Sequence, residues 1–120
     1  MKTYKSVILV GLLAIPLLGF GKIDFTRDKA ACEAGVPEAC FNLSLVYYRG
    51  GIVKQDYKKA FELSKMACDK GNVKGCFGLG LFYNTGKGVK QDNQKSLFYY
   101  TKACEMGNID ACYNVGTLLS

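Results

Sequence analysis

The sequence contains no histidine. This absence excludes Ser-His-Asp and Cys-His nucleophilic catalysis, and it removes the side chain on which most zinc hydrolase sites depend. The elements of a serine β-lactamase are also missing, because no serine is followed by lysine three positions later and neither Ser-Asp-Asn nor Lys-Thr-Gly occurs. The segment TGKG at 85–88 is not a phosphate-binding loop, since Gly88 stands where a serine or threonine would bind magnesium. The sequence therefore identifies no catalytic residue, and we expect no metal site and no cofactor.

A concentrated block of positive charge is missing as well. The chain carries 16 Lys plus Arg against 10 Asp plus Glu, and the lysines are spread along it instead of forming a run. Scattered lysines are typical of solvated helix faces, whereas nucleic-acid binding requires a basic patch. We therefore expect no nucleic-acid partner.

The first 21 residues differ from the rest of the chain. Two lysines precede an uncharged run over 6–21, which Pro16 interrupts. A membrane span needs about 20 consecutive apolar residues, so the pattern favours a secretory signal peptide at 1–21 over a transmembrane anchor. Cleavage after Gly21 would remove two lysines and leave 14 basic against 10 acidic residues in 22–120, a net charge of +4 with no stable membrane anchor.

The remaining chain repeats itself at an offset of 36 residues. Two sets of cysteines align at this offset, which are Cys32, Cys68 and Cys104, and Cys40, Cys76 and Cys112. Between them, GGIVKQD at 50–56 matches GKGVKQD at 86–92. A period of this length predicts a solenoid of stacked supersecondary units. The even number and regular spacing of the cysteines indicate a disulfide framework, which forms in a secreted or periplasmic protein.

Each repeat unit is predicted to contain two helices. Asp56 and Asp92 are suitable N-caps for helices over 57–70 and 93–106, which the following glycines would end. The second helix of each unit begins after a short turn, at Asn72 or Asn108, and in the first copy with Pro37 at the first helical position. These second helices are expected to end at 49 and 85.

The first cysteine of each pair then lies in the last turn of one helix, and the second lies in the first turn of the next. Helices joined by so short a turn bring such positions within the Cα separation of about 5.5 to 6 Å that a disulfide needs. We predict the bridges Cys32–Cys40, Cys68–Cys76 and Cys104–Cys112. A zinc site is the alternative, but it requires closer cysteine pairs, usually with histidine, and the sequence contains neither.

Other side chains recur with the repeat and are predicted to pack between its helices. Glycine inside a helix costs about 1 kcal/mol relative to alanine, so the small residues at Ser44, Gly80 and Gly116 indicate a close approach to a neighbouring helix. Most of the clustered aromatic residues are expected in the core between repeats, namely Tyr47, Tyr48, Phe82, Tyr83, Phe98, Tyr99 and Tyr100.

One helical stripe varies between the copies while the cysteine and glycine framework is constant. Positions spaced by four, three and four residues share one helix face. The stripe comprises Glu38, Asn42, Leu45 and Arg49, then Lys74, Gly78, Leu81 and Thr85, then Asp110, Asn114 and Thr117. It is interpreted either as the lining of a concave binding surface, which solenoids commonly provide, or as a solvated face that is free to vary.

The cysteine spacing, the Leu79-Gly80 pair and the segment at 86–92 together resemble the Sel1-like repeat proteins, in particular the secreted Helicobacter cysteine-rich proteins. The resemblance covers residues 22–120. It implies a right-handed αα superhelix related to tetratricopeptide repeats, with one disulfide per repeat. The sequence ends at Ser120 inside the third helix of its type, so we expect a truncated last repeat without a capping unit.

The resemblance also implies two functions. Members of the family are described as secreted factors that engage host or cell-surface partners, and several are described as penicillin-binding proteins or slow β-lactamases. We predict an all-α, disulfide-stapled interaction module for an unknown host or cell-envelope protein. The alternative is a binder or slow hydrolase of a β-lactam or peptidoglycan-like ligand, which rests on the resemblance alone and would need an unrecognised site.

Overall fold

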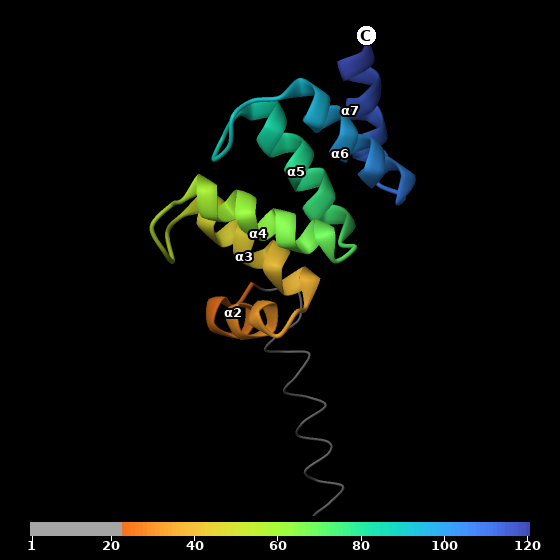
Figure 1. Cartoon of the computed structure of the whole chain (residues 1–120). Helices are drawn as coiled ribbons and strands as arrows, with labels where there is room; N and C mark the ends of the chain where they lie inside the picture. Colours follow the sequence, from red (N-terminus) through yellow and green to blue (C-terminus); the bar gives the residue numbers. More distant parts are fainter. Residues whose placement is uncertain (1–22) are drawn as a thin grey trace, which may run out of the picture.

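The computed structural model describes residues 23–120, and the expected signal peptide at 1–21 lies outside them. This part of the chain forms six helices and no strand. The helices are α2 (Phe25–Glu33), α3 (Pro37–Arg49), α4 (Tyr57–Asp69), α5 (Val73–Thr85), α6 (Asn93–Glu105) and α7 (Ile109–Leu119). Consecutive helices pack against each other, with α2 and α7 at opposite ends of the stack (Figure 1). The predicted all-α repeat solenoid is confirmed.

The five helices α3 to α7 begin where the sequence predicts. Asp56 and Asp92 accept hydrogen bonds of 3.0 Å from backbone N–H groups in the first turns of α4 and α6. Asn72 and Asn108 do the same at 2.8 Å for α5 and α7. Pro37 occupies the first position of α3, where its missing N–H would have had no helical partner. Local sequence therefore sets where these five helices start.

A tight turn joins the two cysteine-bearing helices of each pair. At the end of α4, the Gly71 N–H donates to the Cys68 carbonyl and the Asn72 N–H donates to the Ala67 carbonyl, both at 2.9 Å. This arrangement is a Schellman motif, and it requires the positive φ of 91° that Gly71 adopts. Equivalent turns occur at Gly35 and Gly107. Only 70–72 separate α4 from α5.

The three disulfides have the predicted pairing. The Cα atoms lie 4.6 Å apart in Cys32–Cys40, 4.5 Å in Cys68–Cys76 and 4.7 Å in Cys104–Cys112. These separations are shorter than expected because the turns are so tight, but they lie within the range that disulfides adopt. Each bridge links the end of one helix to the start of the next. The disulfides therefore restrain each turn locally, and none of them connects distant parts of the chain.

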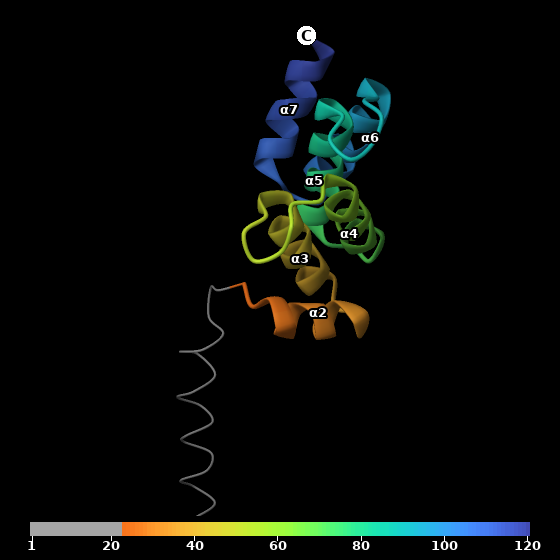
Figure 2. The ribbon, with the colours of Figure 1, turned by 90° about the vertical axis from the view of Figure 1, so that its left-hand side faces the viewer.

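Contacts between the helices recur with the period of the sequence. The edge-to-face pair Phe25–Tyr47 has its equivalent in Phe61–Tyr83, with ring centroids 6.3 and 5.4 Å apart. A lysine ammonium lies over the tyrosine ring in both copies, Lys59 at 5.2 Å and Lys95 at 5.5 Å from the centroid. The aromatic pairs join the two helices of one unit, α2 to α3 and α4 to α5, and the cation–π contacts join α3 to α4 and α5 to α6, which belong to successive units. Figure 2 shows the resulting layers, with α4 and α6 on one side of the stack and α3 and α7 on the other.

The predicted close approach at the small helical residues occurs at two of the three positions. Ser44 is buried between α3 and α4, and a Cβ atom at Gly80 would overlap the ring of Tyr100 on α6. Gly116 has nothing within 4 Å of its Cβ position. The aromatic expectation also needs one correction, because Phe98 is 60% exposed on α6, whereas Phe82, Tyr83 and Tyr100 are buried. No helix within 23–120 is long and apolar enough to cross a membrane.

Candidate functional site: the groove between α3 and α5

An apolar groove opens between α3 and α5, above α4. It has a volume of about 320 Å³, which is close to the lower limit for ligand pockets. Its lining residues come from one face of each helix, and they are Phe41, Ser44, Leu45 and Tyr48 of α3, Ser64 of α4, and Phe77, Gly78, Leu81, Phe82 and Thr85 of α5. A groove with such walls can hold apolar groups of a ligand.

Two serine hydroxyls form the floor of the groove and are hydrogen-bonded to each other. Ser44 Oγ lies 2.7 Å from the Ala60 carbonyl, to which it donates. Ser44 Oγ is also 2.7 Å from Ser64 Oγ, so Ser64 donates the second hydrogen bond. Both side chains are buried. Because the hydroxyl protons point at acceptors in the protein, the floor does not require a polar ligand.

The corresponding space one repeat later, between α5 and α7, is filled by a side chain of α6. Ser64 aligns with Tyr100 at the offset of 36, and the Tyr100 ring packs against Gly80, which aligns with Ser44. The Tyr100 hydroxyl forms hydrogen bonds with Asn114 and Ser96. Asn114 in turn aligns with Gly78 of the first groove. The groove between α3 and α5 is therefore open because two small residues, Ser64 and Gly78, replace a tyrosine and an asparagine.

The burial of Tyr100 leads to a testable prediction about how the stability of the protein depends on pH. Burial raises the pKa of the Tyr100 hydroxyl above 10.0, and the hydrogen bonds to Asn114 and Ser96 partly oppose that shift. The folded state thus disfavours the phenolate, so stability is fully present below the unfolded pKa and falls as the pH rises through the folded pKa. Tyr100→Phe loses about 1 kcal/mol of unfolding free energy at pH 7 through its missing hydrogen bonds.

We expect the difference between wild type and Tyr100→Phe to shrink as the pH rises above about 10. Urea unfolding at pH 7 and at pH 11 measures it. Tyr113→Phe, at a position that is 75% exposed, serves as the control and should show no such change. A constant difference between wild type and Tyr100→Phe at both pH values would contradict the role assigned to burial.

The structure brings only part of the predicted stripe into the groove. Leu45, Leu81 and Thr85 line it, together with Gly78. Glu38, Arg49, Lys74 and Asp110 are exposed outside the lining, and Asn42 is partly buried. Asn114 is engaged with Tyr100. The stripe is therefore not one continuous surface, and a role in binding stays a prediction for its charged members.

Sequence reasoning missed the residues that give the groove its shape. Phe41 and Phe77 align at the offset of 36 and form facing walls, while Tyr48 was expected in the core. No sequence motif surrounds Ser64, so nothing in the pattern marks its hydroxyl as part of a site. The available signal was the contrast between Ser64 and Tyr100 at one position of the repeat.

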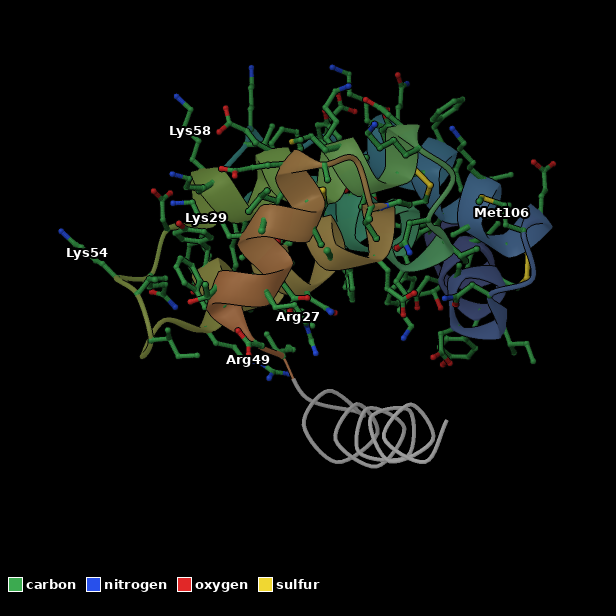
Figure 3. All side chains as sticks on the ribbon, turned by 90° about the horizontal axis from the view of Figure 1, so that it is seen from below. Arg27, Lys29, Arg49, Lys54, Lys58 and Met106 are labelled. Carbon is green, nitrogen blue, oxygen red and sulfur yellow. A yellow bond between two sulfur atoms is a disulfide. The ribbon has the colours of Figure 1, made fainter. Side chains whose placement is uncertain are left out.

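Cations outnumber anions around the groove. The helices α3 and α5 carry Arg49, Lys74 and Glu38, and the Lys87 ammonium adds another positive charge at 3.0 Å from the hydroxyl of the lining residue Tyr48. The hydrogen bond to Tyr48 raises the pKa of Lys87, so this group stays protonated. Figure 3 shows Arg49 and Arg27 on one side of the molecule and Lys58 on the opposite side.

The groove supplies no recognisable hydrolytic machinery. Neither Ser44 nor Ser64 is hydrogen-bonded to a lysine. In the described part of the chain, the lysine side chains that form hydrogen bonds are Lys65, which donates to Asp69, and Lys87, which donates to Tyr48. All six cysteines are in disulfides. Within 23–120 no three acidic, cysteine or histidine residues are grouped in a way that could hold a metal ion. The residues present can bind apolar groups, but they do not form a nucleophile and base pair.

Comparison with known proteins is consistent with this architecture. The Sel1 repeat model matches residues 37–72 and 73–108. Helicobacter pylori cysteine-rich protein B is 31% identical with a TM-score of 0.74, over 82% of this chain and 77% of that one. A Sel1 repeat protein from Oxalobacter formigenes is 30% identical with a TM-score of 0.74, over 76% of this chain and 26% of that one.

A protective antigen of uropathogenic Escherichia coli that displays an SLR fold is also similar. It is 28% identical with a TM-score of 0.77, over 81% of this chain and 21% of that one. The chain thus spans about a fifth of this antigen and about a quarter of the Oxalobacter protein. No protein with a curated description matches the sequence.

Proposed function

Because this chain belongs to the Sel1 repeat family, we propose that it is an extracytoplasmic interaction module that binds a protein partner in the groove between α3 and α5. Sel1 repeats generally mediate protein–protein interaction. The observation that carries the proposal is the open apolar groove, whose equivalent one repeat later is filled by Tyr100. A groove that packing leaves empty on a rigid scaffold is a characteristic of a binding surface.

The disulfides support a secreted or periplasmic location. Three bridges account for all six cysteines, and such frameworks persist in oxidising compartments. The predicted signal peptide at 1–21 agrees with export. The partner would then be a protein of the cell envelope or of a host.

A β-lactam or peptidoglycan-like ligand is not supported by the site. A β-lactam contains a carboxylate and amides that a specific pocket would have to meet with polar groups. The floor hydroxyls Ser44 and Ser64 are engaged with each other and with Ala60, and the walls are mainly apolar. A protein segment that presents an apolar side chain fits this lining better.

Site-specific photo-crosslinking in cells that produce the full-length protein tests the proposal. A benzoylphenylalanine at position 85, in the groove lining, is expected to form an adduct with a single partner protein. The same group at position 102, exposed on α6, is the matched control and should form no such adduct. The protein should also be recovered from the periplasm or medium with no cysteine that reacts with a thiol reagent.

Two results would overturn this function. Equal adducts from both positions, or none from position 85, would show that the groove does not contact a partner. Recovery from the cytoplasm with reactive thiols would contradict the proposed location.

A further inference from the structure

We infer that the groove between α3 and α5 is a socket for one large apolar side chain from an acidic segment of the partner protein. This inference rests on the proposed function and adds to it the chemistry of the segment that is bound. Three independent features carry it: the shape of the opening, the nature of its walls, and the charge around it.

The shape of the opening depends on two coincident substitutions in the repeat. Position 64 holds Ser64, where the next repeat has the large ring of Tyr100. Position 78 holds glycine, where the other repeats have Asn42 and Asn114. Glycine inside a helix is unfavourable by about 1 kcal/mol relative to alanine, and a Cβ atom at Gly78 would lie 3.1 Å from Ser64 Oγ. Both changes therefore remove atoms from the same space, and the glycine does so at a cost in helix propensity.

The walls favour an apolar occupant. Phe41 and Leu45 face the groove from α3, and Phe77 and Leu81 face it from α5. Leu81 is 41% exposed, so an occupant that covers it removes apolar surface from water. Within 23–120 no buried side-chain polar atom lacks a hydrogen-bond partner. The groove therefore favours an apolar side chain, and its described lining contains no buried side-chain polar atom that needs a partner from the ligand.

The surrounding charge favours acidic neighbours of that side chain. Arg49 lies one turn after Leu45 on α3, and Lys74 lies one turn before Gly78 on α5. The Lys87 ammonium is held over the Tyr48 and Tyr57 rings, 5.2 and 5.3 Å from their centroids. Glu38 is the one anion on α3 and α5. The two cations of α3 and α5, together with Lys87 in the loop after α5, attract carboxylates that flank the apolar anchor.

Synthetic peptides test this inference on the oxidised full-length protein. The probe is acetyl-Asp-Glu-Leu-Glu-Asp-amide, titrated while backbone amide resonances are recorded. We expect saturable shifts at Leu45, Leu81 and Thr85, and binding that weakens as salt is added. Replacement of leucine by alanine in the peptide should weaken binding at least about tenfold, and a lysine-flanked leucine peptide should bind at least about tenfold more weakly.

Gly78→Asn provides the matched variant of the protein. It introduces the residue that the other two repeats carry at this position. The Ser64 hydroxyl must shift by a few tenths of an ångström to admit the new Cβ atom, but asparagine is a better helix former than glycine, so the variant should fold. We expect it to reduce affinity for the leucine peptide at least about tenfold. Ser44→Gly combined with Ser64→Phe fills the groove in the manner of Gly80 and Tyr100 and should have the same effect.

Phe98→Ala, on α6, which contributes no residue to the groove lining, is the control and should leave the affinity unchanged. Absence of saturable binding by the leucine peptide would overturn the inference, as would equal affinity of Gly78→Asn and wild type or of the acidic and lysine-flanked peptides. A partner adduct from position 85 with no peptide binding would show that only the chemistry assigned here fails. Failure of both experiments would remove the proposed function as well.

Discussion

Removal of the Cys68–Cys76 disulfide is expected to lower the free energy of unfolding by about 3 to 5 kcal/mol. This bridge closes a short loop, for which the chain-entropy estimate gives about 2.5 kcal/mol. Cys68 and Cys76 are also 1% and 0% exposed, so their replacement by alanine leaves unfilled space in the core and adds to the loss. A domain of this size has only about 5 to 15 kcal/mol of net stability.

Chemical unfolding of Cys68→Ala/Cys76→Ala measures this effect. The matched control is Cys104→Ala/Cys112→Ala, which removes a bridge of the same loop length but with Cys112 exposed on α7. The control should lose about 2 to 3 kcal/mol, because the entropic contribution remains and the loss of core packing is smaller. Equal losses in the two variants would contradict the assignment of a packing role to the central bridge.

Gly80→Ala is expected to destabilise the protein by about 2 kcal/mol, although alanine is the better helix former. The added Cβ atom would overlap the ring of Tyr100, which is only 2% exposed, so a shift of the ring would disturb packed neighbours. Gly116→Ala is the matched control, since Gly116 occupies the same repeat position with nothing within 4 Å. That substitution should instead stabilise the protein by about 0.5 to 1 kcal/mol.

A double-mutant cycle then isolates the contact between α5 and α6. Gly80→Ser and Tyr100→Ser each disturb the packing, but together they reproduce the Ser44 and Ser64 pair of the first groove. The double variant should therefore be more stable than the sum of the single changes predicts, by about 1 kcal/mol or more. Additive losses in thermal or chemical unfolding would show that the two positions do not form one packing unit.

The helix boundaries and the disulfide pairing were predictable because they depend on neighbours in the sequence. Asp56 caps the helix that follows it, and Gly71 supplies the positive φ that ends that helix. The cysteines of each pair are separated by eight residues, so the turn alone brings them together. Because the sequence repeats every 36 residues, a cap or disulfide predicted in one repeat is also predicted in the next.

The groove could not be predicted in the same way. It forms between Leu45 and Leu81, which lie on different repeats, and its depth depends on Ser64, a residue with no distinguishing pattern around it. The stripe placed Leu45 and Leu81 on the correct faces, but it also included Arg49 and Lys74, which lie outside the lining. Helical spacing identifies one face of each helix and gives no information about how close the neighbouring helix stands.

Phe98 on α6 is a second residue whose burial the sequence pattern did not predict correctly. It follows the aromatic pattern of α6, yet it is 60% exposed, while Tyr100 two positions later is buried against Gly80. The sequence by itself determined the repeat, the caps and the disulfides, because short-range hydrogen bonds and turn geometry dictate them. Only the tertiary structure decided which of the two equivalent grooves is filled and which is open, because that depends on the volumes of side chains that meet from different helices.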